Sequence, residues 1–311
     1  MEQGTLTNRN HQGSVGPPSR RGFLGWAGAT AALWAGWILG IFGGRRLSAT
    51  AGEEAAALPE VPGNHLVRMQ KELRQALTRP ISRRRWVMVV DVRACSGCQA
   101  CVVACRAENN VGPEGSYRRV PEGPAGRFPN LTNVFMPTHC VQCDDPPCMR
   151  AVPAGMITKR PDGIVEFDYR RLRGSYAEAA RAACPYRAVH VDQGRLFTHG
   201  TPAVQAYETR PFEEYQGQWQ RVGANTLSGA ARKCHFCLHR IEAGILPACV
   251  TTCMGHAVYF GDANDPTTLV SEMLANYRWI RIHEEAGIEP RVYYVEEPIA
   301  GVRARNCATC H

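Results

Sequence analysis

Fourteen cysteines are the residues of this chain best suited to chemistry, and most of them occur at short, regular spacing. The first run, C-x2-C-x2-C-x3-C, contains Cys95, Cys98, Cys101 and Cys105. In this type of run three thiolates bind one [4Fe–4S] cluster and the fourth reaches a neighbouring cluster. The run therefore predicts iron–sulfur clusters, and with them the transfer of single electrons.

The remaining cysteines form four further groups. These are Cys140, Cys143 and Cys148; Cys184 alone; Cys234, Cys237, Cys249 and Cys253; and Cys307 with Cys310, directly before His311. The last group reads C-A-T-C-H, and C-x-x-C-H is the attachment signal for a c-type haem. His311 is the expected proximal ligand of that haem.

Two other uses of cysteine compete with this interpretation. An exported chain with fourteen cysteines could form seven disulfides, and C-x-x-C pairs also bind zinc. Against disulfides, a chain of 311 residues can bury a core without covalent cross-links. Against zinc, four thiols in one C-x2-C-x2-C-x3-C run suit a cubane cluster better.

The N-terminal residues 1–51 are predicted to form a twin-arginine export signal. Residues 19–24 read S-R-R-G-F-L, and an uncharged run of 23 residues follows from Gly22 to Gly44. Ala49-Thr50-Ala51 is a candidate cleavage site, but the uncharged run is also long enough to anchor the chain in a membrane. This pathway carries folded proteins, so clusters could be inserted in the reducing cytoplasm before the chain reaches the oxidising periplasm.

The charge of the chain is modest. It is +8 overall, and the residues after position 51 contain 31 basic and 27 acidic side chains, which leaves +4. This balance does not indicate a nucleic-acid partner. The sequence contains no Walker loop, dinucleotide fingerprint or nucleophile elbow. We therefore expect a chain without its own catalytic site.

The cysteine groups are expected to lie between short strands and helices of an α+β fold, with two ferredoxin-like cluster-binding modules. A helix is predicted over 64–79, where Pro80 stops it, and a loop over 107–133. A second helix is predicted over 267–286, with Trp279 and Ile280 on its apolar face. Short strands are predicted at 85–91, 163–168, 188–192, 257–261 and 291–296.

These elements suggest a division into five parts. They are a signal segment, 1–51; a linker and short helix, 52–84; a double ferredoxin-like domain, 85–266, with an inner module at 135–195; a C-terminal helix and strand, 267–297; and a tail with the haem motif, 298–311.

Residues 85–297 resemble a known family, the four-cluster iron–sulfur subunits of molybdopterin oxidoreductases and of complexes with NrfD-type membrane subunits. Polysulfide, tetrathionate and dimethyl-sulfoxide reductases and the NrfC-like and DsrO-like proteins contain such subunits. The matching motifs are R-A-C-S-G-C-Q-A-C-V-V-A-C-R-A-E-N-N, C-V-Q-C-D-D-P-P-C, A-C-P-Y, K-C-H-F-C-L-H-R with P-A-C-V-T-T-C, F-G-D-A-N-D-P and V-Y-Y-V.

The chain departs from this family at four ligand positions. The second group should end in a cysteine before a proline, but Val152 precedes Pro153. The third group should contain three more cysteines, and counting back from Cys184 gives Gly174, Ala177 and Ala180. Ferredoxin-type exchange of ligands between runs assigns all four positions to the same cluster. One cluster is therefore predicted to have lost every ligand.

The same exchange leaves three complete ligand sets and no spare cysteine. The predicted sets are Cys95, Cys98, Cys101 and Cys253; Cys105, Cys234, Cys237 and Cys249; and Cys140, Cys143, Cys148 and Cys184. The space of the lost cluster is expected to be filled by protein, with Tyr176 or neighbouring aliphatic residues turned inward. His139, His235, His239 and His256 lie beside cluster cysteines, where they are expected to donate hydrogen bonds to sulfur.

The resemblance implies a periplasmic electron-transfer subunit of a membrane-bound respiratory complex. Its partners would be an NrfD-like, quinone-reactive membrane subunit and a molybdopterin or multihaem cytochrome subunit. Its cofactors would be three [4Fe–4S] clusters and one covalently attached haem c. A diffusible periplasmic carrier with the same cofactors is the alternative.

Overall fold

The computed structural model describes residues 64–125, 127–201, 203–282 and 287–295. The predicted export signal and the haem motif at Cys307, Cys310 and His311 lie outside these described residues. All described residues belong to one compact unit. Within the described ranges, no helix has the length and apolar character needed to cross a membrane.

A four-stranded sheet forms the frame of this unit. Its strand order is β12 (Val258–Asp262), β1 (Trp86–Asp91), β14 (Val292–Val295) and β13 (Trp279–Ile280). β1 is antiparallel to β12 and parallel to β14, so that Met88 lies between Phe260 and Val292. The run of valines in β1 favours an extended backbone, and its first five residues are buried. The predicted strands 85–91, 257–261 and 291–296 are thus present and form one sheet.

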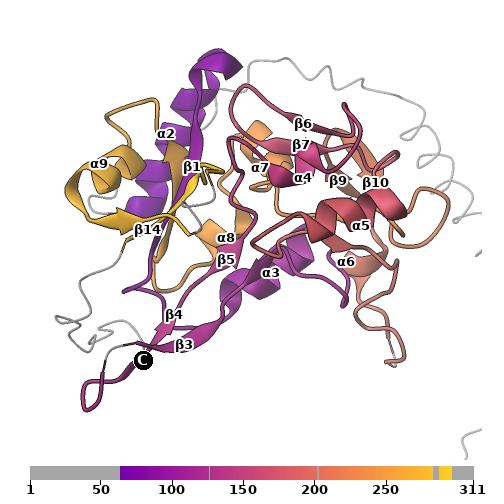
Figure 1. Ribbon diagram of the computed structural model, residues 1–311, viewed down its shortest axis with the longest axis horizontal. Helices are drawn as coiled ribbons and strands as arrows, with labels where there is room; N and C mark the ends of the chain where they lie inside the picture. The colour runs from indigo at the N-terminus through magenta and orange to yellow at the C-terminus, as the bar shows by residue number, and fades with distance from the viewer. Residues whose placement is uncertain (1–63, 126, 202, 283–286, 296–311) are drawn as a thin grey trace, which may run out of the picture. The chain divides into compact units, whose positions relative to one another are not determined.

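Two helices pack on this sheet, as Figure 1 shows. They are α2 (His65–Leu77) and α9 (Leu269–Asn276). The Asn64 side chain caps α2 by accepting hydrogen bonds from the N–H groups of Leu66 and Val67, at 3.0 and 3.2 Å. Met69 and Leu73 of α2 are buried against the core. This helix matches the one predicted before Pro80.

The helix predicted over 267–286 is wrong in its second half. α9 ends at Asn276, and Trp279 and Ile280 instead form β13, which pairs with Val295 and Tyr294. Apolar residues at helical spacing satisfy a strand equally well when a sheet edge is available, and the tertiary partner decides between the two. The segment therefore extends the sheet.

The prediction of a loop over 107–133 is also wrong in part. The segment contains β2 (Arg118–Arg119), which pairs with β5 (Thr138–His139). It also contains β3 (Glu122–Ala125), which forms a hairpin with β4 (Thr132–Phe135). Figure 1 shows this hairpin projecting away from the sheet. The glycines and prolines of segment 107–133 led to the prediction of a loop, because such residues usually mark loops.

The rest of the unit consists of short elements around the cysteines. The helices are α3 (Ala100–Glu108), α4 (Pro147–Arg150), α5 (Ser175–Ala182), α6 (Ala206–Thr209), α7 (Leu238–Glu242) and α8 (Ala248–Thr251), with a 3₁₀ turn at Ile81–Arg83. The paired strands are β6 (Ile157–Lys159) with β7 (Val165–Phe167), β8 (His190–Val191) with β11 (Ala231–Arg232), and β9 (Phe212–Glu214) with β10 (Gly217–Trp219).

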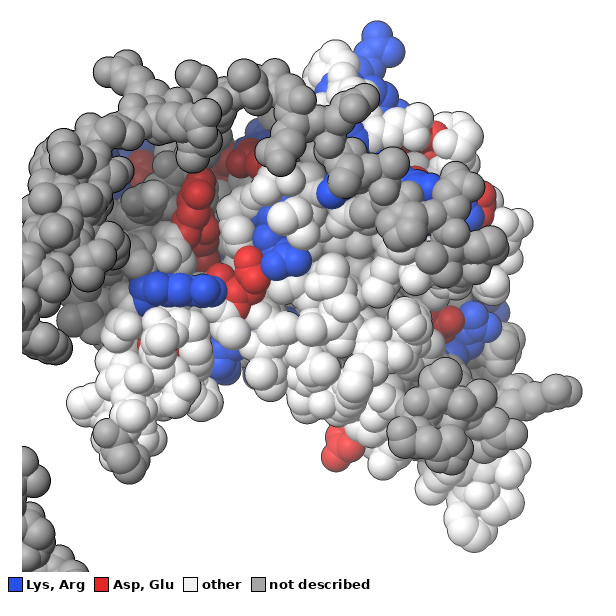
Figure 2. All heavy atoms as spheres, turned by 180° about the vertical axis from the view of Figure 1, so that it is seen from behind, with Lys and Arg blue, Asp and Glu red and all other residues white. Residues whose placement is uncertain are grey.

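Two hydrophobic cores support these elements. The first surrounds the four-stranded sheet and contains α2, α9 and the start of α3. The second contains α5 together with β6, β7, β9 and β10. The fold is therefore mixed α/β with small sheets. On the face shown in Figure 2, acidic and basic side chains lie beside one another between larger uncharged areas.

Candidate iron–sulfur centres

The first group of thiols joins the loop after β1 to the end of α8. Cys95, Cys98, Cys101 and Cys253 line one small pocket. Gly97 has a left-handed backbone with φ +72°, and a Cβ there would lie 2.5 Å from the Phe135 ring, so the turn requires glycine. Cys98 is exposed, whereas Cys101 is buried at the N-terminus of α3. This group therefore lies at the protein surface.

The second group is fully buried. It consists of Cys105 from the end of α3, Cys234 and Cys237 from the turn before α7, and Cys249 from α8. Burial, and then the charges of the other three thiols, raise the pKa of Cys105 well above its usual value. The side-chain amide of Asn109 lies 3.5 Å from Cys105 Sγ and 3.6 Å from Cys237 Sγ. This amide is therefore a hydrogen-bond donor to two ligands of one set.

The third group is formed by Cys140, Cys143, Cys148 and Cys184. Burial, and then the charge of the Cys140 thiol, raises the pKa of Cys148 to about 12. Burial, and then the charges of the other three thiols, also raises the pKa of Cys143. Cys148 lies on α4, and Cys184 follows α5. Residues far apart in the sequence are thus brought to one site.

The cysteines that end the first and third groups occupy the same type of turn. After Cys253, His256 has a left-handed backbone, and the Ala257 N–H lies 3.2 Å from Cys253 Sγ. After Cys184, Arg187 has the same conformation, and the Ala188 N–H lies 3.4 Å from the sulfur. A backbone N–H aimed at a thiolate stabilises its negative charge. The repeated turn supports the assignment of two related modules.

The donor sets fit a four-iron cluster better than a single ion or disulfides. Every described cysteine is a free thiol. Within the described ranges, no three His, Cys, Asp or Glu side chains lie close enough to hold one metal ion. A cubane holds its thiolates farther apart than a single ion does, because an iron atom occupies each corner. A cationic centre would also stabilise the thiolate forms of Cys105, Cys143 and Cys148, whose pKa values are raised by burial and then by the neighbouring thiols.

Three of the four positions without cysteine lie in or against the second hydrophobic core, and the fourth, Gly174, is exposed. Ala177 and Ala180 are fully buried on α5, and Val152 packs against the same core. Gly174 precedes α5 with φ +57°. Aliphatic and aromatic side chains from elsewhere fill the surrounding space: Phe167, Tyr169, Leu172, Phe212, Trp219 and Leu227.

Of the two alternatives expected to fill this space, Tyr176 does not turn inward, whereas the neighbouring aliphatic residue Leu172 is buried. Tyr176 is 43% exposed, because consecutive helical residues point about 100° apart and Ala177 occupies the buried face. Phe212 and Trp219 come from the β9–β10 hairpin, which the cysteine spacing gave no reason to place here. The length of the chain between Cys184 and Cys234 was the available signal for an insertion.

A buried ion network ties this hairpin to the second thiol group, and the sequence did not predict it. Arg232 lies on β11, two residues before Cys234. It forms ion pairs with Asp192 at 2.6 Å and Glu214 at 2.7 Å. Tyr117 and Tyr169 donate hydrogen bonds to Glu214 at 2.9 and 2.5 Å. All of these side chains are buried. Each charge in the network is therefore paired, as burial requires.

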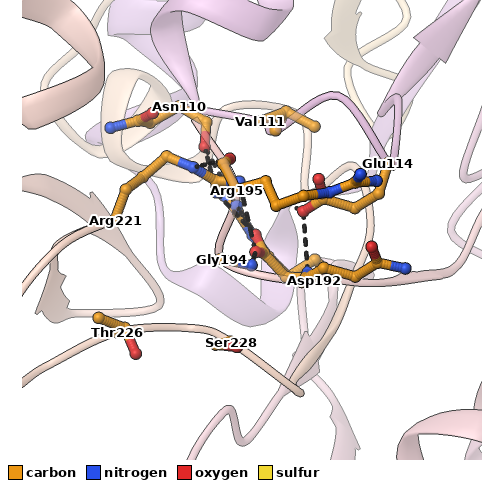
Figure 3. A network of polar contacts seen from close by, with 12 residues as sticks. Asn110, Val111, Glu114, Asp192, Gly194, Arg195, Arg221, Thr226 and Ser228 are labelled. Carbon is orange, nitrogen blue, oxygen red and sulfur yellow. Dashed lines mark hydrogen bonds and ion pairs between the residues drawn. The ribbon is translucent and has the colours of Figure 1, made fainter. Parts of the chain in front are cut away.

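Arg221 continues the same network. Its guanidinium lies 2.8 Å from Asp192 and 3.4 Å from Glu114, and it donates to the Asn110 carbonyl oxygen at 3.1 Å (Figure 3). Asn110 directly follows Asn109, whose amide faces the second thiol group. The network thus fixes the chain around that group.

Three of the four histidines near the thiols make contacts other than the expected hydrogen bonds to sulfur. His239 Nε2 lies 2.9 Å from the Glu108 carboxylate. His235 Nδ1 accepts the Leu238 N–H at 2.8 Å, and its Nε2 lies 3.5 Å from Glu214. His139 Nδ1 lies 2.8 Å from the Cys140 carbonyl oxygen. The described contacts of His235 and His239 therefore position the chain around the second group.

Buried groups of four thiols, carried by short turns of an α/β scaffold, define the class of cysteine-ligated cluster proteins. Comparison with known proteins agrees. Residues 131–199 and 216–263 match the family described as 4Fe-4S dicluster domain. The gap in this match, 200–215, contains α6 and β9.

Named relatives extend the match over most of the chain. The B subunit of selenate reductase from Mesobacillus selenatarsenatis is 45% identical over 230 residues, covering 74% of this chain and 78% of the relative. The B subunit of tetrathionate reductase from Salmonella typhimurium is 35% identical over 218 residues, covering 68% and 73%. The corresponding polypeptide of polysulfide reductase from Wolinella succinogenes is 29% identical over 231 residues, covering 71% and 99%. The chain belongs to this family of iron–sulfur electron-transfer subunits, in which catalysis resides in another subunit of the complex.

Proposed function

We propose that this chain is the periplasmic electron-transfer subunit of a membrane-bound respiratory oxidoreductase complex. It relays electrons between a quinone-reactive, NrfD-like membrane subunit and a catalytic or cytochrome partner. Three [4Fe–4S] clusters and one haem c carry the electrons. The ligands of the clusters are the three thiol groups described above, and Cys307, Cys310 and His311 hold the haem.

The observation that carries this proposal is the linear order of the thiol groups. Helix α3 carries Cys101 of the first group and Cys105 of the second. Gln142, which lies between Cys140 and Cys143 of the third group, donates a hydrogen bond to the carbonyl oxygen of Cys234 of the second group at 2.7 Å. The second group therefore lies between the other two. Clusters in such a row would pass electrons from one end of the chain to the other.

The surface at one end of this row suits a protein partner. Cys98 of the first group is exposed, and nearby Val103 and Met254 are each 66% exposed. Met254 directly follows Cys253, and Val103 lies on α3 beside Cys101. Apolar surface beside an accessible cluster ligand favours close approach of a redox partner. Two relatives are B subunits of selenate reductase and tetrathionate reductase, which supports a catalytic subunit as that partner.

Fractionation of native membranes tests the complex. A tagged full-length chain should remain with the membranes and, after mild detergent, purify with an integral membrane subunit. A quinol added to these membranes should reduce the clusters of the chain, measured by loss of their visible absorbance. A chain recovered alone from the soluble periplasm, with clusters that quinol does not reduce in membranes, would instead support the diffusible carrier.

The haem assignment has its own test. Deletion of residues 307–311 should abolish haem-peroxidase staining of the denatured protein, because Cys307 and Cys310 would form the covalent bonds to haem. Cluster absorbance should stay within about a tenth of the full-length value, since the deleted residues supply no ligand to the three predicted sets. Joint loss of stain and cluster absorbance would show that the assignment of cysteines is wrong.

A further inference from the structure

Arg118 is a buried cation that, among the described residues, lacks a carboxylate partner. Arg118 lies on β2, is 2% exposed, and pairs with His139 of β5. Nη1 lies 3.5 Å from the Met88 sulfur, and within the described structure no protein nitrogen or oxygen accepts from Nε or Nη2. Isolated buried charges are strongly unfavourable. A negative group must therefore face this guanidinium in the folded protein.

The nearest negative groups are cluster ligands from two different sets. Burial acts to lower the pKa of Arg118, but the thiols of Cys249 and Cys101 raise it, and the balance leaves it above its usual value. Cys101 belongs to the first thiol group and Cys249 to the second. β2 also packs against α3, the helix that carries Cys101 of the first group and Cys105 of the second. Arg118 thus lies where the two groups approach each other.

Comparison with Arg232 shows that this arrangement is specific. Arg232 is equally buried, but Asp192 and Glu214 neutralise it. The fold therefore supplies carboxylates where a buried arginine only supports structure. At Arg118 the described residues supply sulfur instead. The guanidinium carries five N–H donors in a rigid fork, so one side chain can address two sulfur-rich sites at once.

We propose that Arg118 is the shared counter-ion of the first and second clusters and sets the reduction potential of both. This inference rests on the proposed function only in that those two thiol groups hold clusters. Arg118 stabilises the extra negative charge that each site gains with one electron, because a fixed positive charge lies near both. Both potentials are therefore higher with Arg118 than without it. The third cluster should be affected less, because Cys101 and Cys249, the thiols that act on Arg118 most strongly, belong to the first and second groups.

The test is an anaerobic redox titration of the full-length protein, followed by electron paramagnetic resonance. In Arg118→Gln, the ratio of reduced to oxidised protein at a fixed potential should fall about tenfold for the first and second clusters, which is about 59 mV for a one-electron couple. The potential of the third cluster should shift less than the other two. Titration of Cys184→Ala identifies which signal belongs to the third cluster.

Arg119→Gln is the matched control. Arg119 is the next residue along β2, is exposed, and donates to the carbonyl oxygens of Tyr186 and Arg187 at 3.1 and 2.8 Å. All three potentials should match the wild type in this variant. Unchanged potentials in Arg118→Gln, or equal shifts of all three clusters, would overturn the proposal.

Assembly of the clusters supplies a second readout. Arg118→Met fills a similar volume without needing a counter-charge. If either variant fails to retain clusters, the loss should be confined to the first and second sites, and a simultaneous loss of all three would contradict the counter-ion role. Iron analysis of the wild type distinguishes failure of the Arg118 proposal from failure of the proposed function. A wild-type protein that lacks the first and second clusters would refute the proposed function itself.

Discussion

Replacement of Cys184 by alanine should convert or destroy one cluster and leave two intact. Cys184 supplies one of four thiols to the third group, while the first and second groups draw every thiol from elsewhere. Non-haem iron should therefore fall from about twelve to as few as about eight per chain. Iron analysis combined with electron paramagnetic resonance measures both the loss and the identity of the remaining signals.

Cys310→Ala is the control for this experiment. It also removes one cysteine, but from the tail, so it should lower covalent haem and leave non-haem iron unchanged. Three unaltered cubane signals in Cys184→Ala would show that Cys184 is a spare thiol. The exchange of ligands between the second and third cysteine runs would then be wrong.

Replacement of Arg232 by methionine should destabilise the protein by about 3–5 kcal/mol, the usual cost of leaving buried charges without their partner. Arg232 pairs with Glu214 and Asp192, and both carboxylates are about 1% exposed or less. Arg68→Met is the control: Arg68 also pairs with two carboxylates, but its side chain is 38% exposed. That change should cost no more than about 1 kcal/mol. Anaerobic urea unfolding of the cluster-loaded proteins compares them.

The pH dependence of this effect has a definite sign. In the wild type, burial acts to raise the pKa of Glu214, but Arg232 and His235 hold it far below the usual value. The stability from this pairing is present above the unfolded pKa, about 4.3, and is lost as the pH falls through the folded pKa. Without Arg232, burial dominates and raises the pKa of Glu214. The difference in the free energy of unfolding between variant and wild type should then become smaller as the pH falls from 8 to 5.5. A difference that grows over this range would contradict this account.

The cysteine spacing yields three predicted ligand sets, because ligand exchange between runs is a rule of topology that does not require packing detail. The structure places Cys253 beside Cys101, and Cys105 beside Cys234, as that rule requires. The strands of the central sheet were also legible, since continuous β-branched runs such as 86–90 suit buried strands.

Features that depend on long-range packing could not be predicted. Trp219 fills the second core from β10, which local sequence does not connect to α5. Arg118 and Arg232 look alike in the sequence, and only their surroundings separate a counter-ion facing sulfur from a residue in a paired network. Trp279 lies at helical spacing but joins a sheet edge.

The proposed loss of one cluster site would have a structural consequence. Ala177 and Ala180 are small and buried, and α5 lies close to α4 and β11, where a cubane would otherwise hold the chain apart. The β9–β10 hairpin contributes Phe212 and Trp219 to the same apolar core. Under this proposal, hydrophobic side chains replace metal ligation as the source of cohesion in this module.

We propose that this chain holds three [4Fe–4S] clusters, one fewer than the four-cluster subunits that its cysteine motifs resemble. Quantitative analysis of non-haem iron and acid-labile sulfide in the anaerobically purified, full-length protein tests it most directly. The account predicts about twelve irons and about twelve sulfides per chain, four of each per cubane. Values near sixteen would contradict the lost site at Val152, Gly174, Ala177 and Ala180, and values near eight would contradict one of the three thiol groups.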